Sequence, residues 1–413
     1  MLYKREILDA VIQCVDEYAI TLITGARQVG KTTLVSYFEK EKGFTYLSFD
    51  DTDLLAEAKS DPKRFIESHR PPLILDEAQR VPEIFLEIEA VVNRVKRIEG
   101  SQAANGMYIL TGSQKFNLMK EVSESMSGRV GMVDMPPLSQ REIRGWDGKE
   151  FAIDNEGLLD AAERRELGDE ALYESIVRGF YPARWEIAGK PIKNYYANYV
   201  KTYVERDVSE LIHLRDRQKF ENLLRILASL TGEEYVPDNI AKTLGVDKNT
   251  VSAWVSIAVT GDIVRLLQPY YEDSINKRIV KRNKLFFNDT GLAFYLLGID
   301  SPASLKRSTF KGRMVETYIH NEIYKSYLNR GIEPKMFFYR DNNQNEIDLI
   351  LVSDGKLDFI ECKAGKKFGG DAIKGFRQLA NTKFEINGQC VLCTTEDPYR
   401  IASGVFAFPI RCL

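Results

Sequence analysis

A glycine-rich loop stands between a β-branched run and a helical pattern in residues 20–34, which read ITLITGARQVGKTTL. The glycines let backbone N–H groups close around phosphate oxygens, and the following helix points its N-terminus at the same anion. Lys31 can then reach the terminal phosphates, and the hydroxyl of Thr32 can bind Mg²⁺. We expect this P-loop to bind ATP through Gly25, Ala26, Arg27, Gln28, Val29, Gly30, Lys31, Thr32 and Thr33.

A second apolar strand, PPLILDEAQ at residues 71–79, ends in two acidic residues. Asp76 can hold Mg²⁺ together with Thr32, and Glu77 can orient and deprotonate the attacking water while Lys31 neutralises phosphate charge. Taken alone, the loop has a plainer explanation, a chance glycine turn before a helix. Because a chance turn does not account for the second strand, we expect ATP hydrolysis that depends on Mg²⁺.

A third strand, MYILTGSQ at residues 107–114, also ends in polar residues. Open α/β sheets bind ligands at the carboxyl ends of their strands, so Ser113 or Gln114 can contact the γ-phosphate. A plain turn at the strand end is the alternative.

Arg129 follows a glycine beyond the third strand. From there we expect it to reach the nucleotide of a neighbouring subunit, where an arginine stabilises the charge that develops on the phosphates. A surface ion pair explains the same residue equally well.

Two short apolar runs flank Asp354-Gly355 in the stretch NEIDLILVSDGKLDFIECKAG at residues 345–365. This dipeptide favours a two-residue hairpin turn, which pairs Ser353 with Lys356 and sets Asp348 directly opposite Glu361. In the same register Glu346 faces Lys363, and the two-residue period of a strand places all four side chains on one face. Like charges opposed across a hairpin are destabilising, so the pair of carboxylates needs an explanation.

A divalent ion would explain the opposed carboxylates. Two carboxylates a few ångströms apart form a hard-oxygen site for Mg²⁺ or Mn²⁺, whose charge offsets their repulsion. Lys363 beside them can position or deprotonate a water that attacks a phosphodiester. The alternative is a structural polar face in which Lys363 and Lys366 neutralise the acids. An imidazole-rich zinc site is disfavoured because the chain has three histidines in all.

Residues 220–268 predict helices with a glycine-centred turn at Leu244-Gly245, which is helix-turn-helix spacing. Asp247 or Thr250 would cap the second helix, and a following strand pair makes a winged helix the natural interpretation. The apolar stripe of that helix is Val251, Trp254, Val255 and Ala258.

The predicted recognition helix offers only Lys248 and Asn249 to DNA bases. The basic run 277–284 is better placed to bind DNA phosphates without reading sequence, through Lys277, Arg278, Lys281, Arg282 and Lys284. Its alternatives are a strand edge protected from aggregation by charge, and a domain that only spaces other proteins.

Composition leaves the choice of partner open. The chain has 413 residues, 44% of them hydrophobic, enough for about three domains, and a formal net charge of −3 gives no general attraction to nucleic acid. Its five cysteines follow no disulfide framework, the CxxC at Cys390 and Cys393 is better explained as strand filler than as a metal or redox motif, and no run approaches the ~20 apolar residues that span a bilayer. We expect a cytoplasmic protein with reduced thiols and no membrane insertion.

The strings GARQVGKTTL, LILDEAQ, LTGSQ and GRV followed by PLS resemble the bacterial and archaeal AAA-like ATPases that carry a C-terminal domain called DUF4143. The similarity continues through RGFYPARW, YVERDVSEL and LFFNDTGLAFYLLG to the hairpin, and so covers nearly the whole chain. This resemblance implies ATP binding and a C-terminal fold similar to PD-(D/E)xK nucleases. Within that layout Glu316, Asp348 and Glu361 take the positions of metal ligands, and Asp348, Glu361 and Lys363 those of catalytic residues.

The expected fold class is α/β. We expect a P-loop ATPase core at 1–140, a helical connector at 141–215, a winged helix at 216–300 and a PD-(D/E)xK nuclease-like α/β domain at 301–413. The expected function is Mg²⁺-dependent ATP hydrolysis coupled to a nuclease-like domain that acts on nucleic acid, in a chain that can form homo-oligomers. The alternatives are a nucleotide-switched regulator whose nuclease fold only binds, and a chaperone-like assembly factor that acts on proteins.

Overall fold

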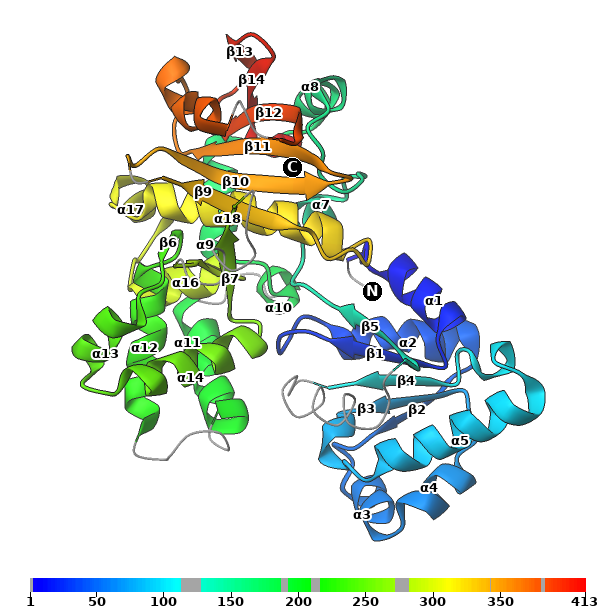
Figure 1. The fold of residues 1–413 in the computed structure, drawn as a ribbon. Coiled ribbons are helices and arrows are strands. Elements are labelled where there is room, and N and C mark those ends of the chain that lie inside the picture. Colours follow the sequence, from blue (N-terminus) through cyan, green and yellow to red (C-terminus); the bar gives the residue numbers. More distant parts are fainter. Residues whose placement is uncertain are drawn as a thin grey trace. The chain divides into compact units, whose positions relative to one another are not determined.

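The computed structural model describes residues 3–112, 128–186, 192–208, 216–271, 282–341, 343–379 and 383–413. The chain divides into two compact units. The first is Met1–Leu138 with Leu328–Ile332, and the second is Ser139–Tyr327 with Glu333–Leu413. Figure 1 shows the elements of each unit coloured along the sequence.

A parallel five-stranded sheet forms the centre of the first unit, in the order β2-β3-β4-β1-β5. Its strands are short and mostly buried, as expected where helices cover both faces of a parallel sheet. Their bounds are β1 Ile20–Thr24, β2 Thr45–Ser48, β3 Leu73–Asp76, β4 Tyr108–Thr111 and β5 Val130–Asp134. The parallel sheet confirms an α/β fold for this unit.

Helices cover the two faces of this sheet (Figure 1). On one face α4 and α5 pack their apolar residues onto β1, β3 and β4 in a single core. The helix α2 contacts β2, β3 and β4, and α1 contacts β1 and β5. The bounds are α1 Leu8–Glu17, α2 Lys31–Lys42, α3 Thr52–Ser60, α4 Pro62–Ser68 and α5 Ile84–Glu99, with short 3₁₀ turns η1 Ala78–Arg80 and η2 Gln102–Ala104.

A nine-stranded sheet runs through the second unit in the order β13-β14-β12-β11-β10-β9-β7-β8-β6. Its strands are β6 Glu233–Glu234, β7 Val264–Pro269, β8 Lys284–Phe287, β9 Met336–Arg340, β10 Glu346–Ser353, β11 Lys356–Lys363, β12 Glu385–Cys393, β13 Tyr399–Ala402 and β14 Val405–Pro409. The parallel pair β7–β9 joins the strands before residue 300 to those after it. The sheet therefore continues across the predicted boundary at 300, and the division of this unit into three domains stays a prediction.

The helices of the second unit begin and end largely as local signals dictate. Asp247 caps α14 by accepting a hydrogen bond from the Asn249 N–H at 2.7 Å, and α13 ends at Gly245 with a positive φ of 62°. The predicted stripe of α14 is buried as expected. The bounds are α7 Gln140–Arg144, α8 Asn155–Arg164, α9 Asp169–Arg178, α10 Pro182–Glu186, α11 Ile192–Tyr203, a π-helical turn η3 Val204–Val208, α12 Arg217–Ser229, α13 Pro237–Leu244, α14 Lys248–Thr260, α16 Thr290–Leu297, α17 Pro302–Arg307, α18 Lys311–Leu328, η5 Gly370–Leu379 and η6 Ile410–Cys412.

The hairpin β10–β11 has the predicted turn and register. Asp354 and Gly355 both have positive φ, 49° and 75°, as a tight hairpin turn of this kind requires. Ser353 pairs with Lys356, and the antiparallel pairing continues to Leu349 and Ile360. One residue beyond this pairing on each strand, Asp348 and Glu361 both form ion pairs with Lys363, so the two carboxylates lie near each other.

No helix among the described residues is long and apolar enough to cross a membrane.

Candidate functional site

The P-loop connects β1 to α2 in a conformation that requires its two glycines. Gly25 has a φ of 136°, and a Cβ built there would lie 2.3 Å from the backbone oxygen of Met135. Gly30 has a φ of 98° and directly precedes α2. Side chains are strongly disfavoured at such angles, so these two positions accept little but glycine.

Lys31 lies against the backbone of its own loop. Its ammonium donates hydrogen bonds to the carbonyl oxygens of Gly25 at 2.8 Å and Ala26 at 2.9 Å. The side chain is buried, so the positive charge is held within the loop rather than in bulk water. This is where an ammonium must be held to meet phosphate oxygens entering the loop.

The carboxylate of Asp76 gathers three hydroxyl groups. Thr32 donates to Oδ2 at 3.0 Å, Tyr46 donates to the same oxygen at 2.6 Å, and Thr111 donates to Oδ1. Burial, and then the hydrogen bond to Asp76, raise the pKa of Tyr46 above its usual range, so its hydroxyl remains a donor. Because the Thr32 hydroxyl and the Asp76 carboxylate lie together, these two residues fit Mg²⁺, which binds hard oxygen ligands.

Glu77 follows directly at the carboxyl end of β3, in the left-handed region with a φ of 56°. Its carboxylate accepts a hydrogen bond from the Gln79 side chain. A non-glycine residue rarely adopts this backbone conformation, and such strain gathers at functional sites. Because β1 and β3 run parallel in one sheet, Glu77 after β3 lies at the same edge as the P-loop after β1, as the sequence predicts.

The structure does not bring Arg129 to the P-loop of its own chain. Arg129 precedes β5, whose first residue Val130 pairs with Ile20 at the start of β1, whereas the P-loop follows the other end of β1. Its guanidinium forms an ion pair with Glu89 on α5 at 2.7 Å. Contact with a neighbouring subunit's nucleotide stays a prediction, and Ser113 and Gln114 lie outside the described residues.

Sequence reasoning missed several residues that hold the nucleotide site. Arg5 is buried and donates to the carbonyl oxygens of Val29 in the P-loop and Pro136, both at 2.8 Å. Thr111 is the polar last residue of the apolar strand β4, at the carboxyl edge of the sheet, a signal that could have identified it. Tyr46 and Arg5 carry no comparable signal because their partners lie far along the chain.

In the second unit, the hairpin carboxylates are paired with lysine. Lys363 forms ion pairs with Glu361 and with Asp348, whose Oδ2 lies 3.9 Å from the ammonium. The same Asp348 oxygen accepts a hydrogen bond from the Cys362 N–H at 2.8 Å. The predicted group of Asp348, Glu361 and Lys363 thus lies together, with both acids buried.

Lys284 joins this group from β8, which corrects its predicted place in an exposed basic run. Its ammonium forms ion pairs with Glu316 on α18 at 3.2 Å and with Glu346 on β10, and only 4% of its side chain is exposed. The physical reason is that β8 is an interior strand, paired with β7 and β6, and all four of its residues are buried. Of the rest of the run, Arg282 is 64% exposed and pairs with Glu234, while Lys277, Arg278 and Lys281 lie outside the described residues.

Lys366, unlike Lys284, is not part of the hairpin group. It pairs with Glu396 at the surface, so it does not neutralise the hairpin acids as one alternative supposed.

Two acids of this carboxylate cluster, which is formed by Glu316, Glu346, Asp348 and Glu361, have raised pKa values. Burial raises the pKa of Glu316 to about 8 despite the nearby Lys284, and burial and Asp348 raise the pKa of Glu361 above its usual range. Burial alone would lower the pKa of Lys284, but the surrounding carboxylates outweigh it and raise that pKa. A carboxyl group that keeps its proton is a poor metal ligand.

The arrangement of this cluster does not fit a divalent ion. Within the described part of the chain, no group of three or more His, Cys, Asp or Glu side chains is placed to hold a metal. The oxygens of the cluster turn to the two ammonium groups and to a backbone N–H instead of converging on one point. The metal-ligand roles of Glu316, Asp348 and Glu361 stay a prediction that this geometry does not favour.

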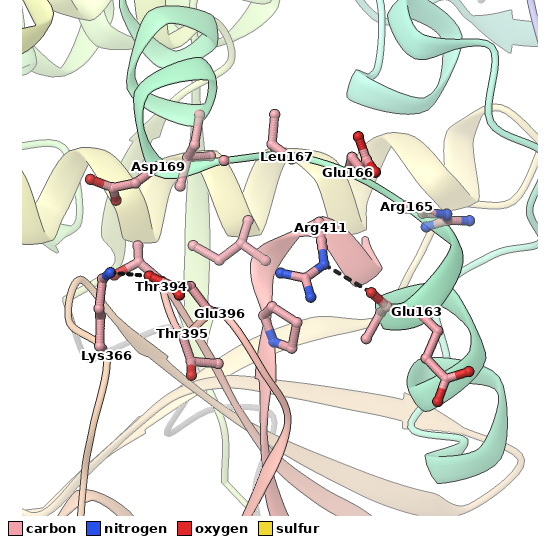
Figure 2. Close-up of a pocket in the computed structure, with 15 residues that line it drawn as sticks. Glu163, Arg165, Glu166, Leu167, Asp169, Lys366, Thr394, Thr395, Glu396 and Arg411 are labelled. Carbon is pink, nitrogen blue, oxygen red and sulfur yellow. Dashed lines mark hydrogen bonds and ion pairs between the residues drawn. The ribbon is translucent and has the colours of Figure 1, made fainter.

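A separate pocket of about 340 Å³ opens where the segment joining α8 to α9 meets the ends of β12 and β14 (Figure 2). Figure 2 shows Lys366 reaching Glu396 and Arg411 reaching the end of α8. Asp169 on its wall pairs with Lys306 at 2.8 Å, and Arg411 donates to the Ala162 carbonyl oxygen at 2.9 Å. Because these charged groups already have partners and none belongs to the predicted sites, we do not place the functional site here.

Two family models match the N-terminal and C-terminal parts of the chain, where the sequence predicts an ATPase and a DUF4143 domain. Residues 17–144 match the family model of an AAA domain, and residues 311–413 match that of a domain of unknown function, DUF4143. The chain is an AAA-like P-loop ATPase fused to a DUF4143 domain. Residues 169–303 match a further domain of unknown function, DUF8612. The AAA domain supports ATP binding and hydrolysis by the first unit.

Several relatives span most of the chain. An uncharacterized protein of Mycobacterium tuberculosis is 24% identical over 88% of this chain and 74% of its own length. An uncharacterized protein of Methanocaldococcus jannaschii is 24% identical over 82% of this chain and 73% of its own. Among solved structures, a Walker-type ATPase of Pyrococcus abyssi is 16% identical and covers 70% of this chain and 94% of its own, with a TM-score of 0.39.

Proposed function

We propose that the first unit binds ATP with Mg²⁺ and hydrolyses it at the P-loop. The observation that carries this proposal is the hydrogen bond from Thr32 to Asp76, beside a loop whose carbonyl oxygens hold the Lys31 ammonium. Backbone N–H groups of the loop and Lys31 would bind the phosphates, and Thr32 and Asp76 would hold Mg²⁺, which when bound would supply positive charge to the phosphates. Glu77 orients a water and takes its proton as that water attacks the γ-phosphate.

Substitution of Lys31 tests nucleotide binding directly. We expect Lys31→Ala to abolish tight ATP binding, measured by calorimetry, because the Lys31 ammonium lies within the loop on the carbonyl oxygens of Gly25 and Ala26, where the phosphates would enter. The matched control is Lys40→Ala, near the end of the same helix α2. Tight ATP binding by Lys31→Ala would contradict the proposal.

We propose that residues 216–300 form a winged helix. The order α12, β6, α13, α14, β7, β8, with β8 between the other two strands, supports this interpretation. On its recognition helix Lys248 is exposed, although it forms an ion pair with Asp238 at 2.8 Å. Contact with DNA phosphates would depend on Lys248, Arg282 and the basic residues that precede Arg282.

We propose that the C-terminal domain is nuclease-like and acts on nucleic acid. The order of elements along the chain supports a PD-(D/E)xK type of core. It is α18, then the three antiparallel strands β9 to β11, then η5 and the parallel strand β12. The test is a binding screen of the purified chain against plasmid, single-stranded DNA and RNA, each with and without ATP. Affinity for nucleic acid that changes with ATP supports coupling, whereas no binding in any arm removes nucleic acid as the partner.

A second candidate function is a nucleotide-switched regulator whose nuclease-like fold binds without cutting. The pairing of the carboxylate cluster with Lys284 and Lys363 favours it, because carboxylate oxygens that are paired with ammonium groups are less available to a metal. In the screen above, ATP-dependent binding without any cleavage in Mg²⁺ or Mn²⁺ is the expected result for this candidate. Homo-oligomerisation, a cytoplasmic location and a role in assembling proteins stay predictions.

A further inference from the structure

One lysine from β8 stands among carboxylates that come from two other elements. The Lys284 ammonium pairs with Glu316 on α18 at 3.2 Å and with Glu346 on β10, and its Nζ lies 5.4 Å from the centre of the Phe338 ring on β9. On β11, which lies beside β10, Lys363 pairs with Glu361, and its ammonium lies 3.9 Å from Asp348. Two ammonium groups therefore already supply positive charge where opposed carboxylates would otherwise repel.

Lys284 is fixed in this place by its backbone. In the sheet it pairs with Leu267 of β7 on one side and with Glu234 of β6 on the other. Its side chain is 4% exposed, so solvent ions cannot exchange with it while β8 keeps these two neighbours. The strand pairing therefore fixes where the side chain starts, and its burial keeps the ammonium among the carboxylates.

We propose that Lys284 is the resident cation of the carboxylate cluster and excludes divalent metal ions from it. A metal needs carboxylate oxygens at about 2.0–2.6 Å with free lone pairs, and Glu316 and Glu346 direct theirs to Lys284 instead. A divalent ion bound to either carboxylate would also lie within a few ångströms of a like-charged ammonium that is buried with them. This inference rests on the proposed nuclease-like character of the domain, and it names what holds that domain's acids in place of a metal.

The same lysine links two predicted domains by charge. Lys284 belongs to the predicted winged helix, whereas Glu316 and Glu346 belong to the nuclease-like domain. Because β8 provides the counter-ion, the pairing of Glu316 and Glu346 depends on β8 remaining in the sheet. The cluster therefore serves to fasten the two parts together in this state, and it can bind a metal only after losing that lysine.

The test is Mn²⁺ binding to the full chain, followed by the loss of the free-ion signal in electron paramagnetic resonance. All proteins carry Asp76→Asn, which removes the carboxylate of the nucleotide site so that only the second unit is measured. We expect Lys284→Met to bind Mn²⁺ about tenfold or more tightly than the protein that keeps Lys284, and a further Asp348→Asn to abolish that gain. The matched control is Lys356→Met on the β10–β11 hairpin, whose ion pair with Glu385 at 2.9 Å is exposed, and we expect no gain there.

Two results would overturn the inference in different ways. Equal, Asp348-dependent binding with and without Lys284 would refute exclusion by the lysine while leaving the metal site intact. No binding in either protein would refute both the inference and the metal site, without touching ATP binding by the first unit. Because Lys284→Met leaves acids without a partner, the double variant Lys284→Met with Glu346→Gln keeps the comparison valid if the single variant does not fold, and the same gain is expected from it.

Discussion

Replacing Tyr46 by phenylalanine removes one hydroxyl from the acid that we expect to hold Mg²⁺. The Tyr46 hydroxyl lies 2.6 Å from Asp76 Oδ2, the oxygen to which Thr32 also donates at 3.0 Å. With Tyr46 gone, Asp76 keeps Thr32 and Thr111 but loses the shortest of the bonds to that oxygen. A hydrogen bond to a charged group contributes about 1.5–3 kcal/mol.

That energy converts to about 10–150-fold in an equilibrium constant, which agrees with the roughly 10–100-fold loss of metal affinity expected when a partner of a metal ligand is removed. We therefore expect Tyr46→Phe to raise the Mg²⁺ concentration that half-saturates ATP hydrolysis by about 10–100-fold. ATP binding without metal should remain as in the natural sequence, because Tyr46 contacts Asp76 rather than the P-loop.

The assay is a Mg²⁺ titration of ATP hydrolysis at saturating ATP, with metal-free ATP binding measured in parallel. Tyr18→Phe is the matched control, since Tyr18 is 39% exposed and precedes β1 at the end of the sheet away from Asp76. An unchanged Mg²⁺ response in Tyr46→Phe would refute the role of Asp76 as the metal-holding acid of this site. An equal loss of metal-free ATP binding would show that Tyr46 acts on the fold of the loop instead.

Two further predictions concern pH and subunit contact. Burial first, and then the positive charges of Arg265 and Lys284, lower the pKa of His320 far below its ordinary value of 6.5. The folded chain therefore binds fewer protons than the unfolded chain below pH 6.5, so this contribution to stability is present above that pH and is lost by about 1.4 kcal/mol per pH unit as the pH falls. Urea denaturation at several pH values should show that His320→Phe loses less free energy of unfolding than the natural chain as the pH falls below 6.5. An equal pH dependence of that free energy in the two proteins would contradict a buried, neutral His320. Should Arg129 act on a neighbouring nucleotide, Arg129→Ala would cut ATP turnover about 100-fold or more and leave ATP affinity intact, whereas Glu89→Ala would not; turnover independent of protein concentration and of Arg129 would dismiss subunit contact.

Features that depend on neighbouring residues were predictable. The P-loop could be predicted from two glycines, whose backbone angles other residues avoid, and from the helical pattern that starts directly after Gly30. The hairpin register follows from Asp354-Gly355 and the alternation of the flanking strands, so the meeting of Asp348 with Glu361 could be derived without a structure. The Asp247 cap is local in the same way.

Features that depend on distant pairing were not predictable. Lys284 stands in a run of basic residues, and only the placement of β8 between β6 and β7 turns its side chain into the interior toward Glu316 and Glu346. Arg129 follows a glycine near a strand, but the register of β5 against β1 sets it at the end of the sheet away from the P-loop. In both cases the sequence shows a positively charged side chain, but the order and register of the strands determine which groups it contacts.

ATP turnover by Glu77→Gln is the most direct measurement of the central claim, which is that this chain hydrolyses ATP at the P-loop with Glu77 as the residue that activates water. The substitution keeps the shape of the side chain and removes its basicity, so ATP affinity should remain within about threefold of the natural chain while turnover falls about 100-fold or more. Glu83→Gln, at the residue before α5, is the matched control and should hydrolyse ATP normally. Turnover by Glu77→Gln at the rate of the natural sequence would contradict the account.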